Sequence, residues 1–283
     1  MKILMIGAHQ DDNEFCCGGL ALKYIKLGYD VQFLSMCNGC GGHHILSPEE
    51  TSATRAKESA AVAKMTGIKY DVWDYDDCNI VADLETRKRV IRYIRNYNPD
   101  MIITHRTNDY MPDHRAVAQL VQDASYLLTV PHECPDAPAM RFMPVIAYDE
   151  DHFTQPPFTP HIVVDIDDVM ETKLRMEDLN VSQVYEWLPY TYGEEDQVPE
   201  TPEERFEWLK GMNITQDTTD EEVMAATRGW AVRDAKTAAK YRKELIEKYG
   251  AEKGSKIRYA EVFEISEYGK QLTEELKKQL FPF

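Results

Sequence analysis

Two short stretches of the sequence concentrate side chains that bind metals and move protons. The first is AHQDDNEF, in which His9 precedes the adjacent carboxylates of Asp11 and Asp12. The second is NDYMPDHRA, which contains Asp113 and His114. Two imidazoles and one carboxylate are a common ligand set for a catalytic divalent metal with one open position. A cation there would also offset the repulsion between Asp11 and Asp12.

Each stretch follows a segment with the apolar pattern of a short buried strand. His9 comes just after the end of the expected strand 2–8, and His105 ends the expected strand 100–105. Ligands of parallel sheets bind beyond the carboxyl ends of the strands. If these two strands are close in the sheet, both polar stretches converge on one edge, where a site is expected.

The order of the expected elements indicates the fold class. Apolar runs predict strands over 2–8, 31–36, 70–75, 100–105, 143–148, 161–166 and 258–265. Helical patterns lie at 18–28, 47–67, 82–99, 167–188, 231–249 and 269–280. Such alternation predicts an α/β, Rossmann-like fold, in which helices cover both faces of a mostly parallel sheet. We expect one domain over 1–283.

The charge balance argues against several partners. The chain has 49 Asp and Glu residues against 32 Lys and Arg, a net charge of −17. Nucleic acids and anionic membrane surfaces need clustered basic charge, so we expect neither as a partner. No apolar run approaches the roughly 18 residues of a membrane-spanning helix. The N-terminal apolar run is too short for a signal peptide, so we expect a cytoplasmic protein. A homo-oligomer is left open.

The CNGC motif at 37–40 has the spacing of a redox or zinc motif, and His43 and His44 follow it. No second cysteine pair completes a four-ligand structural site. Six cysteines are also too few for a disulfide scaffold in a chain of this length. The simpler interpretation is a glycine-rich loop with ordinary reduced thiols.

Together, the two polar stretches resemble the signature motifs of the PIG-L/LmbE-like family, zinc-dependent deacetylases that remove an acetyl group from N-acetylglucosamine-type amides. The first family motif, A-H-P-D-D-x-E followed by G-G, is matched by AHQDDNE and by Gly18 and Gly19. The second, H-P-D-H, is matched at Pro112, Asp113 and His114. Further agreement lies in RAKESAAVAKMTGI at 55–68, HIVVDI at 161–166 and SQ at 182–183.

This resemblance implies a role for each residue of the two motifs. His9, Asp12 and His114 would be the metal ligands, with Zn²⁺ as the expected ion, although other first-row divalent ions bind such sites too. Asp11 would be the general base. Asp113 would belong to the catalytic group as well.

The resemblance also points to residues that contact the substrate. Arg55 would lie at the edge of the pocket, near the catalytic carboxylate or the substrate, and we assign Asn108 to substrate binding as well. An alternative for Arg55 is a helix-surface ion pair with Glu58 or Glu50, which would contribute only a few tenths of a kcal/mol.

The sequence departs from the family pattern at three positions. Gln10 replaces a proline, and Asn180 stands where many members have a histidine. The important change is Met111, which replaces the histidine expected to stabilise the oxyanion or protonate the leaving amine. A thioether has no proton to donate. Loss of one oxyanion donor costs on the order of 10²–10³ in rate.

The expected function is hydrolysis of an acyl amide on an N-acylated amino sugar or a related small molecule. The alternative is a metal-binding family member with lost or altered catalysis, for which Met111 is the evidence. A nucleotide-binding Rossmann protein is disfavoured because no G-x-G-x-x-G follows the first strand.

Residues 186–230 stand apart in composition, with twelve acidic residues, three basic ones and three of the four tryptophans. We expect an acidic, aromatic-rich insertion or lid, whose aromatic rings suit stacking on sugars. The alternative is a solvated acidic surface with tryptophans packed beneath it.

Overall fold

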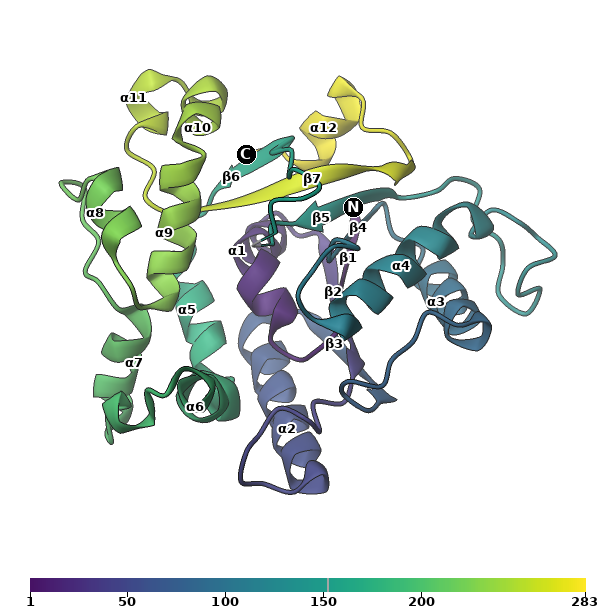
Figure 1. Cartoon of the computed structure of the whole chain (residues 1–283). Helices are drawn as coiled ribbons and strands as arrows, with labels where there is room; N and C mark the ends of the chain where they lie inside the picture. Colours follow the sequence, from purple (N-terminus) through teal and green to yellow (C-terminus); the bar gives the residue numbers. More distant parts are fainter. Residues whose placement is uncertain (152) are drawn as a thin grey trace.

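One sheet organises the residues that the computed structural model describes, 1–151 and 153–283 (Figure 1). Within this part of the chain, its seven strands are β1 Lys2–Gly7, β2 Asp30–Cys37, β3 Lys69–Tyr75, β4 Met101–Thr104, β5 Val145–Asp149, β6 Ile162–Asp165 and β7 Ala260–Gly269. They lie in the order β3-β2-β1-β4-β5-β7-β6. The first five strands are parallel, whereas β7 runs antiparallel to β5 and to β6. The prediction of a mostly parallel α/β sheet is confirmed.

Helices cover both faces of the sheet, as the alternating pattern predicts (Figure 1). The larger helices are α1 Asp12–Lys26, α2 Pro48–Thr66, α3 Leu84–Tyr97, α4 Pro112–Leu127, α5 Met170–Asp178, α7 Pro202–Lys210, α9 Trp230–Lys240 and α10 Arg242–Tyr249. Shorter ones are α6 Leu188–Tyr192, α8 Asp220–Ala225, α11 Ala251–Gly254 and α12 Glu274–Leu280. A π-helical turn, η1 Ser182–Trp187, precedes α6, and a 3-10 turn, η2 Glu195–Gln197, follows it.

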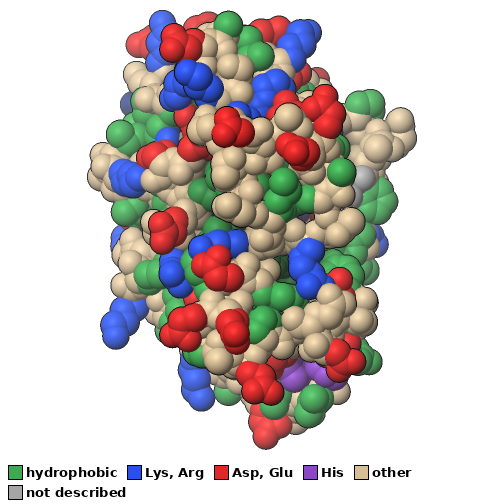
Figure 2. Space-filling model, turned by 90° about the vertical axis from the view of Figure 1, so that its left-hand side faces the viewer, with side chains coloured by type: hydrophobic (Ala, Val, Ile, Leu, Met, Phe, Trp, Pro, Cys, Tyr) green, Lys and Arg blue, Asp and Glu red, His purple; other side chains and the backbone are tan. Residues whose placement is uncertain are grey.

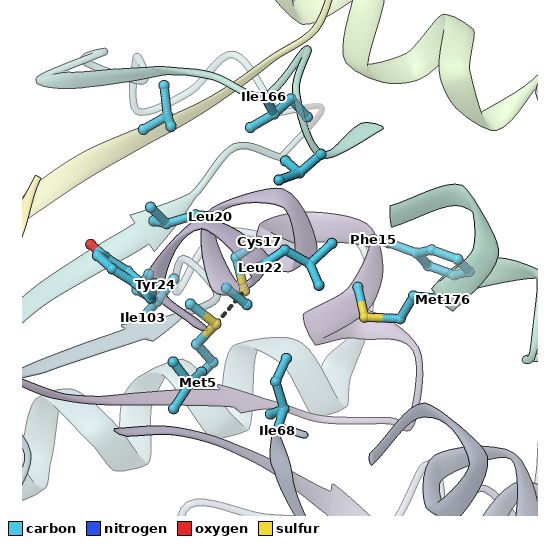
Figure 3. Packing of buried hydrophobic residues seen from close by; sticks show 14 of the residues in the cluster. Met5, Phe15, Cys17, Leu20, Leu22, Tyr24, Ile68, Ile103, Ile166 and Met176 are labelled. Atoms are coloured by element: carbon cyan, nitrogen blue, oxygen red, sulfur yellow. Dashed lines mark hydrogen bonds between the residues drawn. The ribbon is translucent and has the colours of Figure 1, made fainter. Parts of the chain in front are cut away.

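The alternation of side chains along β1 explains why the sheet carries a core on each face. Ile3 and Met5 belong to a cluster with residues of α1, α2, α5, α7 and α9, part of which Figure 3 shows. Leu4 and Ile6 point to the other face, where α3 and α4 cover them. Successive side chains of a strand point to opposite faces, so a strand buried on both sides must be apolar throughout.

The helical pattern predicted over 167–188 is not one helix. α5 ends at Asp178, and the chain resumes as η1 at Ser182. The backbone N–H of Ser182 donates to Glu58 of α2 at 2.7 Å, and the Ser182 hydroxyl donates to the same carboxylate at 2.8 Å. The Ser182 N–H therefore does not donate within an α-helix. This contact with α2 interrupts the single helix predicted over 167–188.

The segment 186–230 packs against the same core as the sheet. Phe206 and Leu209 of α7 are buried in the cluster shared with β1 and α1, and Trp208 and Trp230 lie partly buried against it. Acidic side chains are scattered over the face of the molecule that includes α7, α8 and α9 (Figure 2). The alternative interpretation, in which tryptophans pack beneath an acidic surface, agrees with the packing of Trp208 and Trp230.

No helix in the described part of the chain is both long enough and apolar enough to cross a membrane.

Candidate metal centre

The strand order reverses between β1 and β4, which are hydrogen-bonded neighbours. From β1 the chain continues to β2 and β3 on one side, whereas β4 continues to β5 on the other. Such a switch point opens a crevice beyond the carboxyl ends of the two strands. The two polar stretches of the sequence follow these ends, so the topology brings them together.

His9, Asp12 and His114 meet at this crevice. Each offers one ligand atom, and the three atoms all lie within 4.8 Å of one another. Asp12 lies between the two rings, with Oδ2 3.5 Å from His9 Nδ1 and Oδ1 3.4 Å from His114 Nε2. Two imidazole nitrogens and a carboxylate oxygen at this spacing fit a divalent first-row metal.

The electrostatics of the site also suit a cation. Burial disfavours the charged form of His9, but hydrogen bonds to Asp113 and Asp12 raise its pKa to about 10. Against the same effect of burial, Asp12 helps raise the pKa of His105 to about 10 and that of His114 to about 9. Without a metal, the carboxylates thus draw protons onto these rings. A bound metal ion would supply the same positive charge.

A carboxylate lies behind each of the two candidate ligand histidines. His9 Nε2 is 3.0 Å from Asp113 Oδ2, and His114 Nδ1 is 3.1 Å from Asp109 Oδ1. Asp113 is fully buried and also accepts a 2.7 Å hydrogen bond from the backbone N–H of Cys78. Such outer contacts fix the orientation and the tautomer of metal-binding imidazoles.

Asp12 is held in place by further groups. Two backbone N–H groups at the end of β1 donate to its Oδ2 at 2.9 and 2.7 Å. His105 Nε2 lies 3.2 Å from the same oxygen, and His105 Nδ1 lies 3.6 Å from Asp149. The His105 ring stacks on that of His114, with centroids 4.1 Å apart. His105 therefore supports two candidate ligands at once.

Asp11 has an unusual backbone at the start of α1. Its φ is 120°, in a region that residues with a side chain rarely adopt. Strain of this kind costs of order 1–3 kcal/mol and is concentrated at functional sites. The turn places Asp11 directly before Asp12 in the crevice.

The carboxyl of Asp11 faces Arg55, whose Nη2 lies 3.1 Å from Asp11 Oδ2. Burial raises the pKa of Asp11 to about 7, an effect that Arg55 opposes and the neighbouring Asp12 reinforces. A pKa near 7 suits a group that both accepts and returns a proton at neutral pH.

Arg55 is buried on α2 rather than exposed on its surface. Its Nε lies 3.8 Å from Glu58, but its closer partner is Asp11. Glu50 instead closes the capping box with Ser47 at the start of α2. The alternative of a helix-surface ion pair does not describe Arg55.

Not every predicted residue joins the cluster. The Asn108 amide donates to the carbonyl of Gln155, and within the described residues no contact links it to the three candidate ligands. Met111 caps the start of α4, and its backbone N–H donates to Asp109 at 2.8 Å.

Sequence reasoning missed Asp109, Asp149, Cys37 and Asp77 as neighbours of the site. Asp149 and Cys37 are the last residues of β5 and β2. Their position at the carboxyl edge of the sheet was a signal that could have found them.

One aromatic ring, that of Tyr110, lies beside a candidate ligand. The Tyr110 ring lies 5.5 Å from that of His114. Burial and nearby charges, including Asp12 and Tyr192, raise the pKa of Tyr110. The ring of His44 stacks on Tyr190 of α6 at 3.9 Å. This contact joins the loop after β2 to the segment 186–230.

Known proteins resemble this chain in sequence. The sequence model of the family described as PIG-L, GlcNAc-PI de-N-acetylase, matches residues 4–125. Diacetylchitobiose deacetylase of Thermococcus kodakarensis is 28% identical over 205 residues, which cover 67% of this chain and 74% of that protein. The 4-oxalmesaconate hydratase of Pseudomonas putida is 23% identical over 196 residues, which cover 66% and 76% of the two chains.

A solved structure shares the fold along most of the chain. N,N'-diacetylchitobiose deacetylase from Pyrococcus horikoshii superimposes with a TM-score of 0.67 at 23% identity, covering 94% of this chain and 83% of that one. The family match spans both polar stretches, from β1 to α4. Over residues 4–125, which contain both polar stretches, the chain is therefore similar to the PIG-L family.

Proposed function

We propose that this protein is a metal-dependent amide hydrolase, which removes an acyl group, acetyl in the first instance, from an N-acylated amino sugar or a related small molecule. The observation that carries the proposal is the pairing of a metal-ligand set with a separate carboxylate. Asp12 lies between His9 and His114, while Asp11 faces Arg55.

Each of these residues has a definite part in the proposed reaction. Bound by His9, Asp12 and His114, a divalent ion such as zinc would supply a Lewis acid that polarises the amide carbonyl and lowers the pKa of water. Asp11 accepts the proton of the attacking water and returns it to the departing nitrogen. Arg55 holds the Asp11 carboxylate at 3.1 Å.

Two further residues complete the proposal. Asp113 serves the reaction by orienting His9 through its 3.0 Å contact. Asn108 remains proposed as a substrate contact at the rim, where it would have to exchange its bond to the Gln155 carbonyl for one to the substrate.

The test is a turnover screen with protein of known metal content. Metal-loaded wild type should release free amine from N-acetylated amino sugars, and Asp11→Asn with equal metal should not. If no N-acyl sugar yields amine at full metal occupancy, the deacetylase proposal fails.

A hydratase is the second candidate, because one relative carries that name and Met111 occupies the position of the missing imidazole. Hydration of a carbon–carbon double bond expels no amine, so the loss of that donor matters less. Unsaturated carboxylic acids belong in the same screen. Loss of their conjugated absorbance, without amine release from any amide, would favour this reading over the first.

We also propose that 186–230 forms a wall of the substrate pocket within a single domain. Tyr190 and Trp187 lie beside His44. Gly42, two residues before His44, lies close to Arg55. Trp187→Ala should raise KM for amino-sugar substrates several-fold and leave kcat nearly unchanged. The exposed Tyr126→Ala on α4 is the control. An unchanged KM would remove the segment from the pocket.

A further inference from the structure

A second set of metal-binding side chains lies beside the first. The CNGC motif begins at Cys37, the last residue of β2, and Asp77 follows the end of β3. The ligand atoms of His9, Cys37 and Asp77 all lie within 4.8 Å of one another. The proposed hydrolysis uses neither Cys37 nor Asp77.

Backbone contacts hold Cys37 next to the end of β1. Its N–H donates to the carbonyl of Ala8 at 2.7 Å, directly before His9 in the chain. The following N–H, of Asn38, donates to the carbonyl of Tyr75 at the end of β3 at 2.8 Å. The side chain of Cys37 is fully buried. The ends of three adjacent strands therefore fix the thiol beside the imidazole.

The glycines of the loop fix the position of Asp77. Its two carboxylate oxygens accept hydrogen bonds from the N–H groups of Gly39 and Gly41, at 2.9 and 3.0 Å. A Cβ on Gly41 would lie 3.0 Å from the Asp77 side chain, so the close approach suits glycine. Each oxygen keeps a lone pair for a cation, because a carboxylate can accept about four bonds.

We propose that His9, Cys37 and Asp77 form a second site, for a thiophilic divalent ion such as Zn²⁺, Co²⁺ or Cd²⁺. Thiolate, imidazole and carboxylate are all ligands of these ions, and the thiolate favours them over Mg²⁺ and Ca²⁺. Binding displaces the thiol proton of Cys37 to solvent. The site goes beyond the proposed hydrolysis, and metal binding tests it whether or not the protein turns over a substrate.

The shared imidazole couples the two sites. His9 belongs both to the set with Asp12 and His114 and to the set with Cys37 and Asp77. An ion that draws the His9 ring toward Cys37 weakens the first centre. Excess thiophilic metal should therefore inhibit any activity that depends on that centre.

The experiment is a titration of metal-free protein with Co²⁺, followed by near-ultraviolet absorbance and by equilibrium dialysis. Thiolate ligation to Co²⁺ gives a charge-transfer band that imidazole and carboxylate ligands do not give. Wild type should bind a first equivalent without this band and a second, weaker equivalent with it. Cys37→Ala should lose the band and the second equivalent, and keep the first.

Matched variants identify which side chains bind the second metal ion. Cys40→Ala removes the other cysteine of the motif, which lies outside the set, and should behave as wild type. Asp77→Asn keeps an acceptor for the loop and should weaken the second equivalent at least tenfold. It covers the case in which Cys37→Ala fails to fold.

Two results would overturn the inference. One is wild type that binds a single equivalent and never develops the band. The other is a band that survives in Cys37→Ala or disappears in Cys40→Ala. In an active preparation, inhibition by excess Zn²⁺ should likewise be relieved in Cys37→Ala and persist in Cys40→Ala.

Discussion

Asp11 and Asp12 are neighbours in the sequence, yet their surroundings drive their pKa values apart. Burial opposes ionisation of Asp12, but His114 and His105 hold its pKa well below the usual range. Burial instead raises the pKa of Asp11 to about 7 despite Arg55. Pairs of titratable groups with divided pKa values indicate a division of roles. The permanently ionised carboxylate suits a metal ligand, and the other suits a base.

This division predicts different outcomes for two matched variants. Asp12→Asn should lose most of the bound metal, because a neutral amide is a poorer ligand than a carboxylate. Asp11→Asn should keep the metal and lower kcat by about 10²–10⁴, the usual contribution of a general base. Elemental analysis and turnover on the same samples check both. Equal metal loss in the two variants would mean that the roles are assigned wrongly.

Met111→His tests the position at which the chain departs from the second PIG-L/LmbE-like motif. In the described residues, Asp113 Oδ1 has no hydrogen-bond partner, since its contacts to His9 and Cys78 use Oδ2. By the pairing that the family motif implies, an imidazole at 111 is expected to donate to that oxygen. We expect wild type to be slow on plain N-acetylglucosamine and Met111→His to be faster at constant metal content, by up to the roughly 10²–10³ of one oxyanion donor. A variant slower than wild type would mean that the site is adapted to methionine.

At the residue scale, the sequence predicts the candidate metal ligands better than the carboxylates that orient them. His9, Asp12 and His114 were found because fixed motifs contain them. Asp109 lies within the second polar stretch, but its pairing with His114 is a side-chain contact that the motif does not state, and Asp149 reaches His105 from the end of β5. Such outer contacts depend on how the strand ends meet in space, which a single sequence does not give.

At the scale of elements, α1 depends on a distant strand. The helix has a non-helical residue at Cys17, and the N–H groups of Gly19 and Leu20 then donate to Glu261 of β7 at 2.7 and 2.8 Å. Glu261 also pairs with the buried Lys173 of α5 at 2.9 Å. A Cβ on Gly19 would lie 2.9 Å from this carboxylate, which explains the glycine in the motif.

Glu261→Ala should therefore destabilise the protein strongly. It leaves the Lys173 ammonium with one carboxylate partner fewer and two helix N–H groups unpaired, and removing one partner of a buried pair costs about 3–5 kcal/mol. Glu267→Ala, at an exposed position of the same strand, is the control and should stay within about 0.5 kcal/mol of wild type. Urea denaturation measures both. Similar midpoints for the two variants would contradict the structural role of Glu261.

Local patterns predicted the strands well, and failed where remote residues decide the outcome. Each predicted strand appears. The apolar run is continuous in β1, β4 and β5, which are buried along nearly their whole length. The helix predicted over 167–188 is interrupted because Ser182 bonds to Glu58, which lies 124 positions earlier in the chain. The helix predicted from residue 18 begins at Asp12, within the polar motif itself.

At the scale of the whole molecule, the candidate centre should make stability depend on metal and on pH together. In the metal-free protein the pKa values of His9, His105 and His114 are raised to about 10, 10 and 9, above the ordinary value of 6.5. A raised folded-state pKa gives stability that is complete below the unfolded pKa and is lost as the pH rises through the folded one. The free energy of unfolding of chelated protein should thus fall between about pH 6.5 and pH 10.

Metal-loaded protein should lose less stability over the same range, because the ion replaces the protons that hold the carboxylates and imidazoles together. The ion also adds stability at every pH at which it binds the folded state more tightly than the unfolded one. Urea denaturation of chelated and metal-loaded samples at pH 6.5 and 9.5 measures both the pH-dependent loss of stability and the stability that the ion adds. His114→Ala is the control, because it lacks one of the three candidate ligands. The gap between chelated wild type and wild type loaded with one equivalent should widen at the higher pH, and it should be much smaller in His114→Ala, which keeps only the weaker second site. Parallel pH profiles for the two forms of wild type would show that the charges of this cluster are not linked to a metal ion.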